Sequence, residues 1–297
     1  MEKLLKEIRI NGLRAQLGSD HHVPLSAARH YADELIAEQS TDVLFLLGDL
    51  FQVGEADPSP QINFLIGLLA GHYGDIVYVP GNHCLRGRAD PWSSFRFPKN
   101  VHYPQRALDT PVVQLGGQRC LIGNLFYDQR FLDPRLLGFT PVQVAEFYST
   151  RVNDGRYFLN GDTSLFPQMT ARLAAALDRS VDIVATHGLP HPSLITFRVN
   201  ELTDKLKRLA DEIGAPFVAD PDDDAACAAR YRMSAERFRA EWNFKSFIMG
   251  SNALTHPAAD FKDGLTVLYG HNHRGGFREE IIRGKRVRFN THQVERY

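Results

Sequence analysis

The sequence predicts an α/β fold. Short continuous apolar runs alternate, over the first two hundred residues, with stretches in which apolar residues recur at helical spacing. Continuous rather than alternating apolar runs indicate strands that are buried on both faces. Such strand–helix alternation favours an α/β sandwich. With 297 residues, 43% of them hydrophobic, the chain can bury a sizeable core, which excludes a disordered or fibrous protein.

Four apolar runs are predicted as buried strands. They cover residues 42–47, 75–79, 181–185 and 265–269. Two other stretches have the pattern of β-hairpins, one around Gly116 and Gly117 and one over residues 277–291 at the end of the chain.

Helical spacing first appears after Pro24, where Leu25, Ala28, Ala32 and Leu35 recur on one face. A second helix is expected to begin near residues 59 and 60, because the proline at residue 60 costs no hydrogen bond in the first turn. Further helical patterns begin at residue 140 and cover residues 164–178, 200–213 and 225–247.

The domain organisation is predicted to be a single domain over residues 1–297. The chain shows no internal repeat and no linker rich in glycine or serine. Residues 188–264 break the strand–helix alternation with a proline-containing loop and two helical patterns. We therefore expect this segment to be a helical insertion that caps the functional site, and residues 277–291 to be a C-terminal hairpin.

The net charge and the cysteines indicate which partners and which cellular compartment to expect. Lys and Arg number 34 and Asp and Glu 35, a formal charge of −1, so nucleic acid is not favoured as a partner. The three cysteines, Cys84, Cys120 and Cys227, form no C-x-x-C pair, which favours a reducing compartment. The charged N-terminus and the lack of a run of ~18 apolar residues predict a cytoplasmic protein without a membrane partner.

Residue types that bind metals follow the predicted strands, and two more, Asp20 and His22, follow Leu17-Gly18-Ser19. In an open α/β sheet, ligands bind at the carboxyl ends of the strands. If the strands share one sheet, these side chains converge on one edge. The residues are Asp20, His22, Asp49, Asn82, His83, His187, His271 and His273.

In chain order these residues form five short motifs: Asp20-His21-His22, Gly48-Asp49, Gly81-Asn82-His83, His187 and Gly270-His271-Asn272-His273. Together they resemble the calcineurin-like metallophosphoesterase family, a superfamily of binuclear metal hydrolases. The resemblance implies a four-layer α/β/β/α sandwich, here with a helical insertion.

The resemblance also implies two divalent metal ions. Imidazole ligands suit Mn, Fe or Zn better than Mg or Ca. One ion would be held by Asp20, His22 and His273, and the other by Asn82, His187 and His271, with Asp49 bridging the two.

The implied activity is hydrolysis of a phosphoester bond in a phosphodiester or nucleotide-type substrate. A hydroxide that bridges the two cations attacks phosphorus, and His83 acts as the acid that stabilises the phosphate. A small phosphorylated molecule is the expected partner, and the oligomeric state is not predicted. The alternatives are a nuclease of the same family acting on DNA or RNA, and a non-catalytic scaffold that uses the same fold for protein contacts.

The chain departs from the family pattern at two positions. Cys84 stands where the family usually has Asp or Glu, and Gln52 stands where a further acid often follows the bridging Asp. Arg86, Arg88 and His191 are candidate substrate contacts, each weighed evenly against a structural or solvated role.

Overall fold

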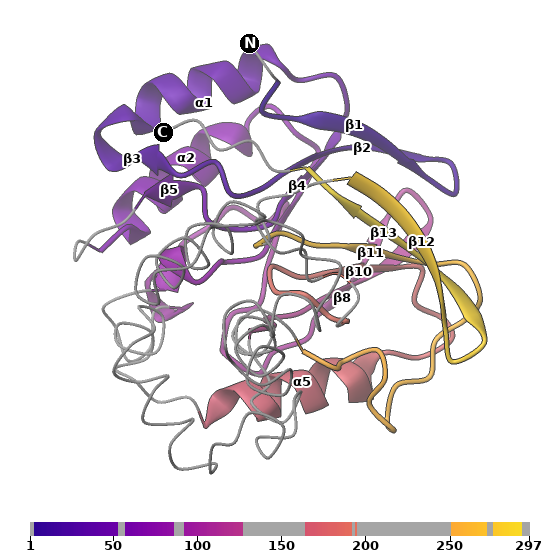
Figure 1. Ribbon diagram of the computed structural model, residues 1–297. Helices are drawn as coiled ribbons and strands as arrows, with labels where there is room; N and C mark the ends of the chain where they lie inside the picture. The colour runs from indigo at the N-terminus through magenta and orange to yellow at the C-terminus, as the bar shows by residue number, and fades with distance from the viewer. Residues whose placement is uncertain are drawn as a thin grey trace, which may run out of the picture.

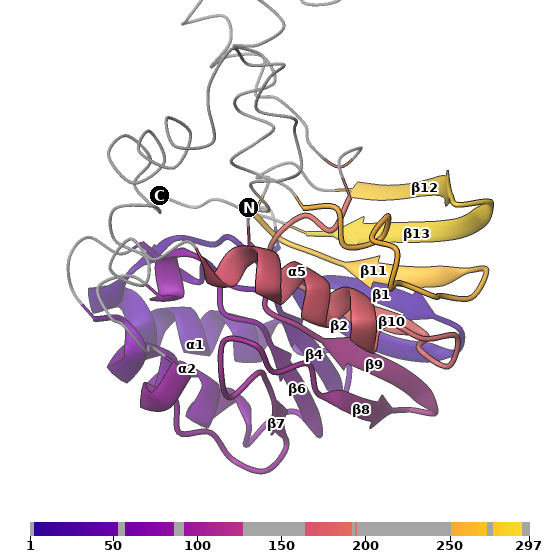
Figure 2. The same cartoon turned by 90° about the horizontal axis from the view of Figure 1, so that it is seen from below.

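Two mixed β-sheets form the centre of the molecule (Figures 1 and 2). The computed structural model describes residues 3–52, 57–85, 92–126, 164–191, 194, 251–271 and 276–292. The first sheet has the order β1-β2-β4-β6-β7, with strands Lys6–Ile10, Leu13–Gly18, Val43–Leu46, Asp75–Tyr78 and Val101–His102. The second has the order β12-β13-β11-β10-β9-β8, with strands Gly276–Ile282, Lys285–Thr291, Leu265–Leu268, Ile183–Ala185, Gln118–Ile122 and Val112–Leu115.

The remaining described elements are short strands and helices. Strands β3 (Val23–Pro24) and β5 (Phe51–Gln52) pair in parallel beside the first sheet. The α-helices are α1 (Ala28–Ala37), α2 (Ser59–Leu69) and α5 (Leu165–Ala176). Single 3₁₀ turns cover Leu25–Ala27, His83–Leu85 and Trp92–Ser94.

The core lies in three clusters that separate the layers. Side chains alternate along each strand, so Phe45 of β4 packs between the sheets while its neighbours Leu44 and Leu46 pack under α1 and α2. In β10, Ile183 and Ala185 likewise face the first sheet, whereas Val184 packs with the residues of α5. The prediction of an α/β fold whose strands are buried on both faces is confirmed.

The strands that precede the site residues belong to two different sheets. The convergence of these residues was expected for strands of a single sheet, and the structure does not have that arrangement. Strands β4 and β6 lie side by side in the first sheet, and β10 and β11 lie side by side in the second. The two sheets nevertheless bring their carboxyl ends to one common edge. The backbone N–H of Ser19, after β2 of the first sheet, donates to the carbonyl of His292, after β13 of the second.

The helices agree closely with the sequence pattern where they are described. Helix α2 begins at Ser59 with proline in its first turn, and α5 lies within the predicted residues 164–178. The structure adds the hairpin β1–β2, which is not among the predicted elements; Asn11 and Gly12 at its tip both have the positive φ that an Asn-Gly turn adopts.

The helix predicted from residue 140, the helical patterns at 200–213 and 225–247 and most of the insertion at 188–264 lie outside the described residues. In the part of the chain that the structure describes, we find no helix with the length and apolar character needed to cross a membrane.

Candidate metal centre

Two loops with left-handed backbone conformations form the base of the site. After β2, Asp20 and His22 have φ values of 55° and 48°, and after β4, Asp49 has a φ of 51°. The loops are held to each other by backbone hydrogen bonds, from the N–H of Asp20 to the carbonyl of Gly48 (2.9 Å) and from the N–H of His22 to the carbonyl of Asp49 (3.1 Å). These bonds hold both loops in a conformation that non-glycine residues rarely adopt.

Asp49 lies at the centre of the site and is fully buried. Its Oδ1 accepts the backbone N–H of His83 at 2.8 Å. A Cβ atom at Gly81 would lie 2.2 Å from the same Oδ1 atom, so no larger residue fits there without moving Asp49. The glycine of the Gly81-Asn82-His83 motif therefore provides the space for the carboxylate.

His187 follows β10 and presents one ring nitrogen to the site. Its Nδ1 lies 2.6 Å from the carbonyl oxygen of Leu47, and because a carbonyl can only accept, Nδ1 carries a proton. The opposite nitrogen, Nε2, is 3.0 Å from Oδ1 of Asn82 and 3.5 Å from Oδ2 of Asp49. Metal-binding histidines are commonly oriented by such a hydrogen bond from the far nitrogen.

His271 follows β11 and joins the two halves of the site. Its backbone N–H donates to the carboxylate of Asp20, at 3.0 Å and 2.9 Å to the two oxygens. Its Nδ1 is 3.1 Å from Oδ1 of Asn82, and its ring centroid is 5.1 Å from that of His187. Asn82 Oδ1 thus lies against both imidazoles.

The acidic and imidazole groups gather into two sets that share Asp49. One set is Asp49, His187 and His271, and the other is Asp20, His22 and Asp49, with the ligand atoms of each set within 4.8 Å of one another. The Asp and His residues of these sets are divided as the family resemblance implies, and Asn82 lies against His187 and His271. The donor chemistry fits two cations of the Mn, Fe or Zn type, because it combines imidazoles with carboxylates. His273 lies outside the described residues.

The electrostatics of the site centre on Asp49 and His187. Burial by itself raises the pKa of Asp49, but the neighbouring rings of His187, His83 and His22 outweigh it and lower this pKa well below its usual range. Burial by itself lowers the pKa of His187, but the Asp49 carboxylate outweighs it and raises this pKa to about 9. A cation would therefore displace a proton from Nε2 of His187.

His83 lies beside the two sets without belonging to either. It begins the 3₁₀ turn His83–Leu85, and its ring centroid is 4.8 Å from that of His22, with the ring planes at 75°. This position is suited to a proton donor at the rim of the site. No role as a metal ligand is needed for it.

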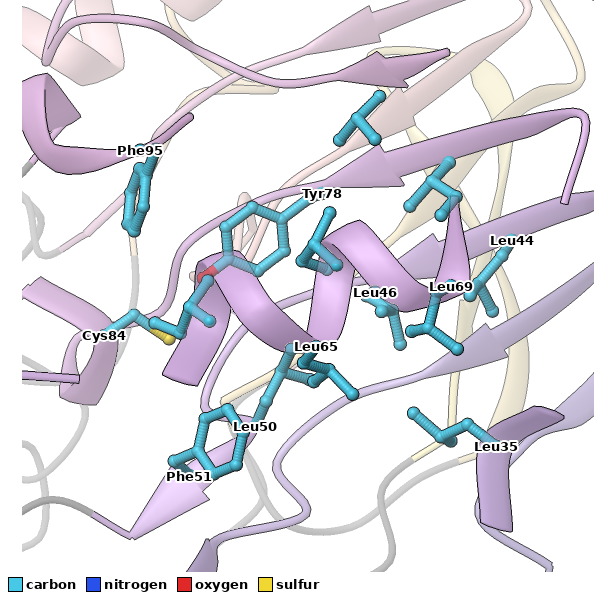
Figure 3. Packing of buried hydrophobic residues seen from close by; sticks show 14 of the residues in the cluster. Leu35, Leu44, Leu46, Leu50, Phe51, Leu65, Leu69, Tyr78, Cys84 and Phe95 are labelled. Atoms are coloured by element: carbon cyan, nitrogen blue, oxygen red, sulfur yellow. The ribbon is translucent and has the colours of Figure 1, made fainter. Parts of the chain in front are cut away.

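The residue after His83 does not supply a carboxylate. Cys84 is buried in the cluster that also contains Tyr78 and Phe51 (Figure 3). Burial, reinforced by the Asp49 carboxylate, raises the pKa of the Cys84 thiol to about 11. Cys84 therefore packs as a neutral, apolar group, and Gln52 at the other departure from the family pattern is exposed.

Of the three candidate substrate contacts, the structure describes His191. His191 is largely buried, and its Nδ1 lies 4.0 Å from a carboxylate oxygen of Glu280 on β12. Burial lowers the pKa of His191, opposed by Glu280 and reinforced by Arg278. Contact between His191 and substrate stays a prediction, and Arg86 and Arg88 lie outside the described residues.

Comparison with known families gives a match over most of the chain. Residues 18–275 match the family model described as calcineurin-like phosphoesterase. The chain belongs to this family. The calcineurin-like phosphoesterases are metal-dependent hydrolases, typically with a binuclear centre, and the two Asp/His sets lie within the matched residues.

Two solved structures are similar to this member of the family. One is the phosphopantetheinyl hydrolase PptH from Mycobacterium tuberculosis, with 18% identity, a TM-score of 0.48, and coverage of 93% of this chain and 87% of that chain. The other is a 5'-nucleotidase precursor from Thermus thermophilus, with 13% identity and a TM-score of 0.32. It aligns with 97% of this chain, which spans 46% of that protein. No curated protein matches the chain.

Proposed function

We propose that the chain is a two-metal-dependent hydrolase that cleaves a phosphoester bond in a small phosphodiester or nucleotide-type substrate. The observation that carries this proposal is the buried carboxylate of Asp49, which two sets of potential ligands share. A carboxylate has two oxygens, and it can therefore serve two cations at once. Such sharing is what a binuclear centre requires.

In this proposal Asp20, His22 and His273 would hold one divalent ion, Asn82, His187 and His271 would hold the other, and Asp49 would serve both. Manganese, iron or zinc fits these ligands. When bound, two such ions polarise a phosphoryl group and make a water acidic enough to act as nucleophile at neutral pH.

Groups of the protein itself orient the ligands and supply the proton. The carbonyl oxygen of Leu47 orients His187 by accepting its Nδ1 proton, and the backbone N–H of His271 holds the carboxylate of Asp20. His83 acts as the acid, because its ring lies at the rim of the site against His22. A protonated imidazole there donates a hydrogen bond to the phosphate and then a proton to the leaving oxygen.

The wider proposal is a cytoplasmic enzyme with the four-layer α/β/β/α arrangement, in which the insertion at residues 188–264 caps the site. Its partner would be a small phosphorylated molecule. The net charge of −1 supports this class of substrate over DNA or RNA.

A substrate panel tests the proposal. Metal-depleted protein would be reloaded with manganese and assayed on phosphomonoesters, a chromogenic phosphodiester, cyclic nucleotides, dinucleotides, and single- and double-stranded nucleic acid. We expect hydrolysis of small phosphoesters that EDTA abolishes. Preferential cleavage of DNA or RNA would favour the nuclease, and inactivity with every divalent metal would favour the scaffold.

A further inference from the structure

His21 lies between two predicted metal ligands but points away from them. Its side chain is fully buried, with Nδ1 in contact with the hydroxyl of Tyr31 and Nε2 at 3.0 Å from the carbonyl oxygen of Leu4. The carbonyl can only accept, so Nε2 carries the proton, and Nδ1 of the neutral ring accepts the proton of the Tyr31 hydroxyl. One tautomer therefore satisfies both contacts.

Gly18 provides the space that this ring occupies. A Cβ atom at Gly18 would lie 2.9 Å from Cε1 of His21 and 3.0 Å from the carbonyl oxygen of Leu4. Gly18 does not have a positive φ, so a glycine is needed here for space and not for backbone conformation. The His21 ring therefore packs directly against the backbone at Gly18 and occupies a defined position.

Tyr31, on helix α1, contacts both of the loops that carry ligands. Its ring meets that of His21 edge to face, with centroids 5.5 Å apart, and meets that of Phe51 in the same manner at 5.8 Å. His21 is the neighbour of Asp20 in the first loop, and Phe51 follows Asp49 by two residues in the second.

The two loops need such support because of their backbone conformation. Asp20, His22 and Asp49 all have φ between 48° and 55°. Non-glycine residues persist in this region only where the surrounding structure holds them, and strain of this kind gathers at functional sites. Tyr31 is buried, and its ring packs against those of His21 and Phe51, one next to each ligand loop.

We propose that Tyr31 and His21 are positioning residues for the metal centre: through the hydroxyl–imidazole contact and the packing on Phe51, they hold the two ligand loops in the geometry that binds metal. This inference rests on the proposed function, because it assumes that the loops bind metal. Neither side chain touches the metal or the substrate in this scheme.

The test is to remove the hydroxyl alone. Tyr31→Phe keeps the ring and its packing, and the dissociation constant for manganese would be measured by calorimetry on metal-depleted protein without substrate. Loss of a group that hydrogen-bonds to a metal ligand typically weakens metal affinity about 10- to 100-fold. The Tyr31 hydroxyl acts through His21 and not on a ligand directly, so we expect the lower end of this range. Turnover should recover at high manganese concentration.

Tyr73→Phe is the matched control. Tyr73 is also buried, and its hydroxyl donates to Oε1 of Gln16 on β2 at 3.2 Å; neither residue belongs to a ligand loop. We expect this variant to bind manganese as the wild type does. An equal loss of affinity in both variants, or none in Tyr31→Phe, would overturn the inference and leave the proposed function standing.

Two variants of His21 provide a second test of the inference if Tyr31→Phe does not fold. The amide of His21→Gln can still accept from Tyr31 and donate to Leu4, whereas His21→Leu can do neither. We expect manganese affinity within about threefold of wild type for Gln and clearly weaker binding for Leu. Equal affinities would overturn the inference, and a wild type that binds no metal would refute the proposed function itself.

Discussion

The backbone N–H of His83 donates a hydrogen bond of 2.8 Å to Oδ1 of Asp49, which ties the proposed acid to the proposed bridging carboxylate. The other oxygen, Oδ2, lies 3.5 Å from Nε2 of His187. Because the bond comes from the backbone of His83, the imidazole can be removed without losing it. The contributions of acid and carboxylate are therefore separable by mutation.

His83→Ala should lose most turnover and keep both metals. General acid catalysis typically contributes 10²–10⁴-fold, so we expect kcat to fall by about that factor. The backbone bond to Asp49 survives in this variant, and the two ligand sets do not include His83. Metal content by elemental analysis, together with kcat on a chromogenic phosphodiester, checks the prediction. Wild-type turnover would refute the role of His83.

Asp49→Asn should lose metal as well as activity, because the carboxylate belongs to both ligand sets. We expect less than one tightly bound manganese per chain, measured by elemental analysis after dialysis. Asp75→Asn is the control, since Asp75 is also on a central strand but begins β6 and pairs with His102 at 2.7 Å, at the end opposite to Asn82. An unchanged metal count in Asp49→Asn would exclude the bridging role.

Gly81→Ala should disrupt the site although Gly81 is no ligand. The added methyl group would lie 2.2 Å from Oδ1 of Asp49 and 2.7 Å from its backbone nitrogen, so the carboxylate must move. We expect metal affinity to fall at least tenfold, measured by calorimetry.

Gly67→Ala gives the matched comparison. Gly67 is exposed on α2, and a Cβ there meets no atom within 4 Å. The change should leave metal binding intact and stabilise the helix by ~0.5–1 kcal/mol. Equal metal affinity in the two alanine variants would contradict the packing argument at Gly81.

Stability should depend on pH through Asp182, the residue directly before β10. Burial by itself raises the pKa of Asp182, but Lys262 and the backbone N–H of Arg119, 2.7 Å away, outweigh it and lower this pKa. A lowered pKa contributes stability above the unfolded value near 3.8, and that contribution is lost as the pH falls through the folded value.

Asp182→Asn should therefore lower the free energy of unfolding by up to ~1 kcal/mol at pH 7, because the pair is partly exposed to solvent, and by less as the pH approaches 3. Urea unfolding over this pH range measures the difference. Asp33→Asn, which removes an exposed ion pair with Arg29, is the control and should change little at any pH. A pH-independent loss in Asp182→Asn would contradict the charge-based explanation.

Local patterns in the sequence predict most of the described elements. The start of α2 at Ser59 follows from proline in the first turn, and the buried strands follow from their continuous apolar runs. The set of residues at the site could also be predicted from their short motifs, most of which follow a predicted strand whose carboxyl end lies at the ligand-binding edge. Their roles as ligands stay a prediction.

Contacts between distant residues could not be predicted in the same way. Whether β4 and β10 share a sheet depends on long-range pairing that no local pattern encodes. Tyr31 occupies an ordinary apolar position of α1, and only the fold places its hydroxyl against His21. The hairpin β1–β2 is different, because Asn11-Gly12 is a strong local turn signal in the sequence itself.

The decisive experiment is a manganese titration of metal-depleted protein in which bound metal and phosphodiester hydrolysis are followed in the same samples. The proposed function predicts two ions per chain and hydrolysis that reaches its maximum only as the second ion binds. Full activity without bound metal, or a protein that binds two ions and hydrolyses no phosphoester in the panel, would contradict it.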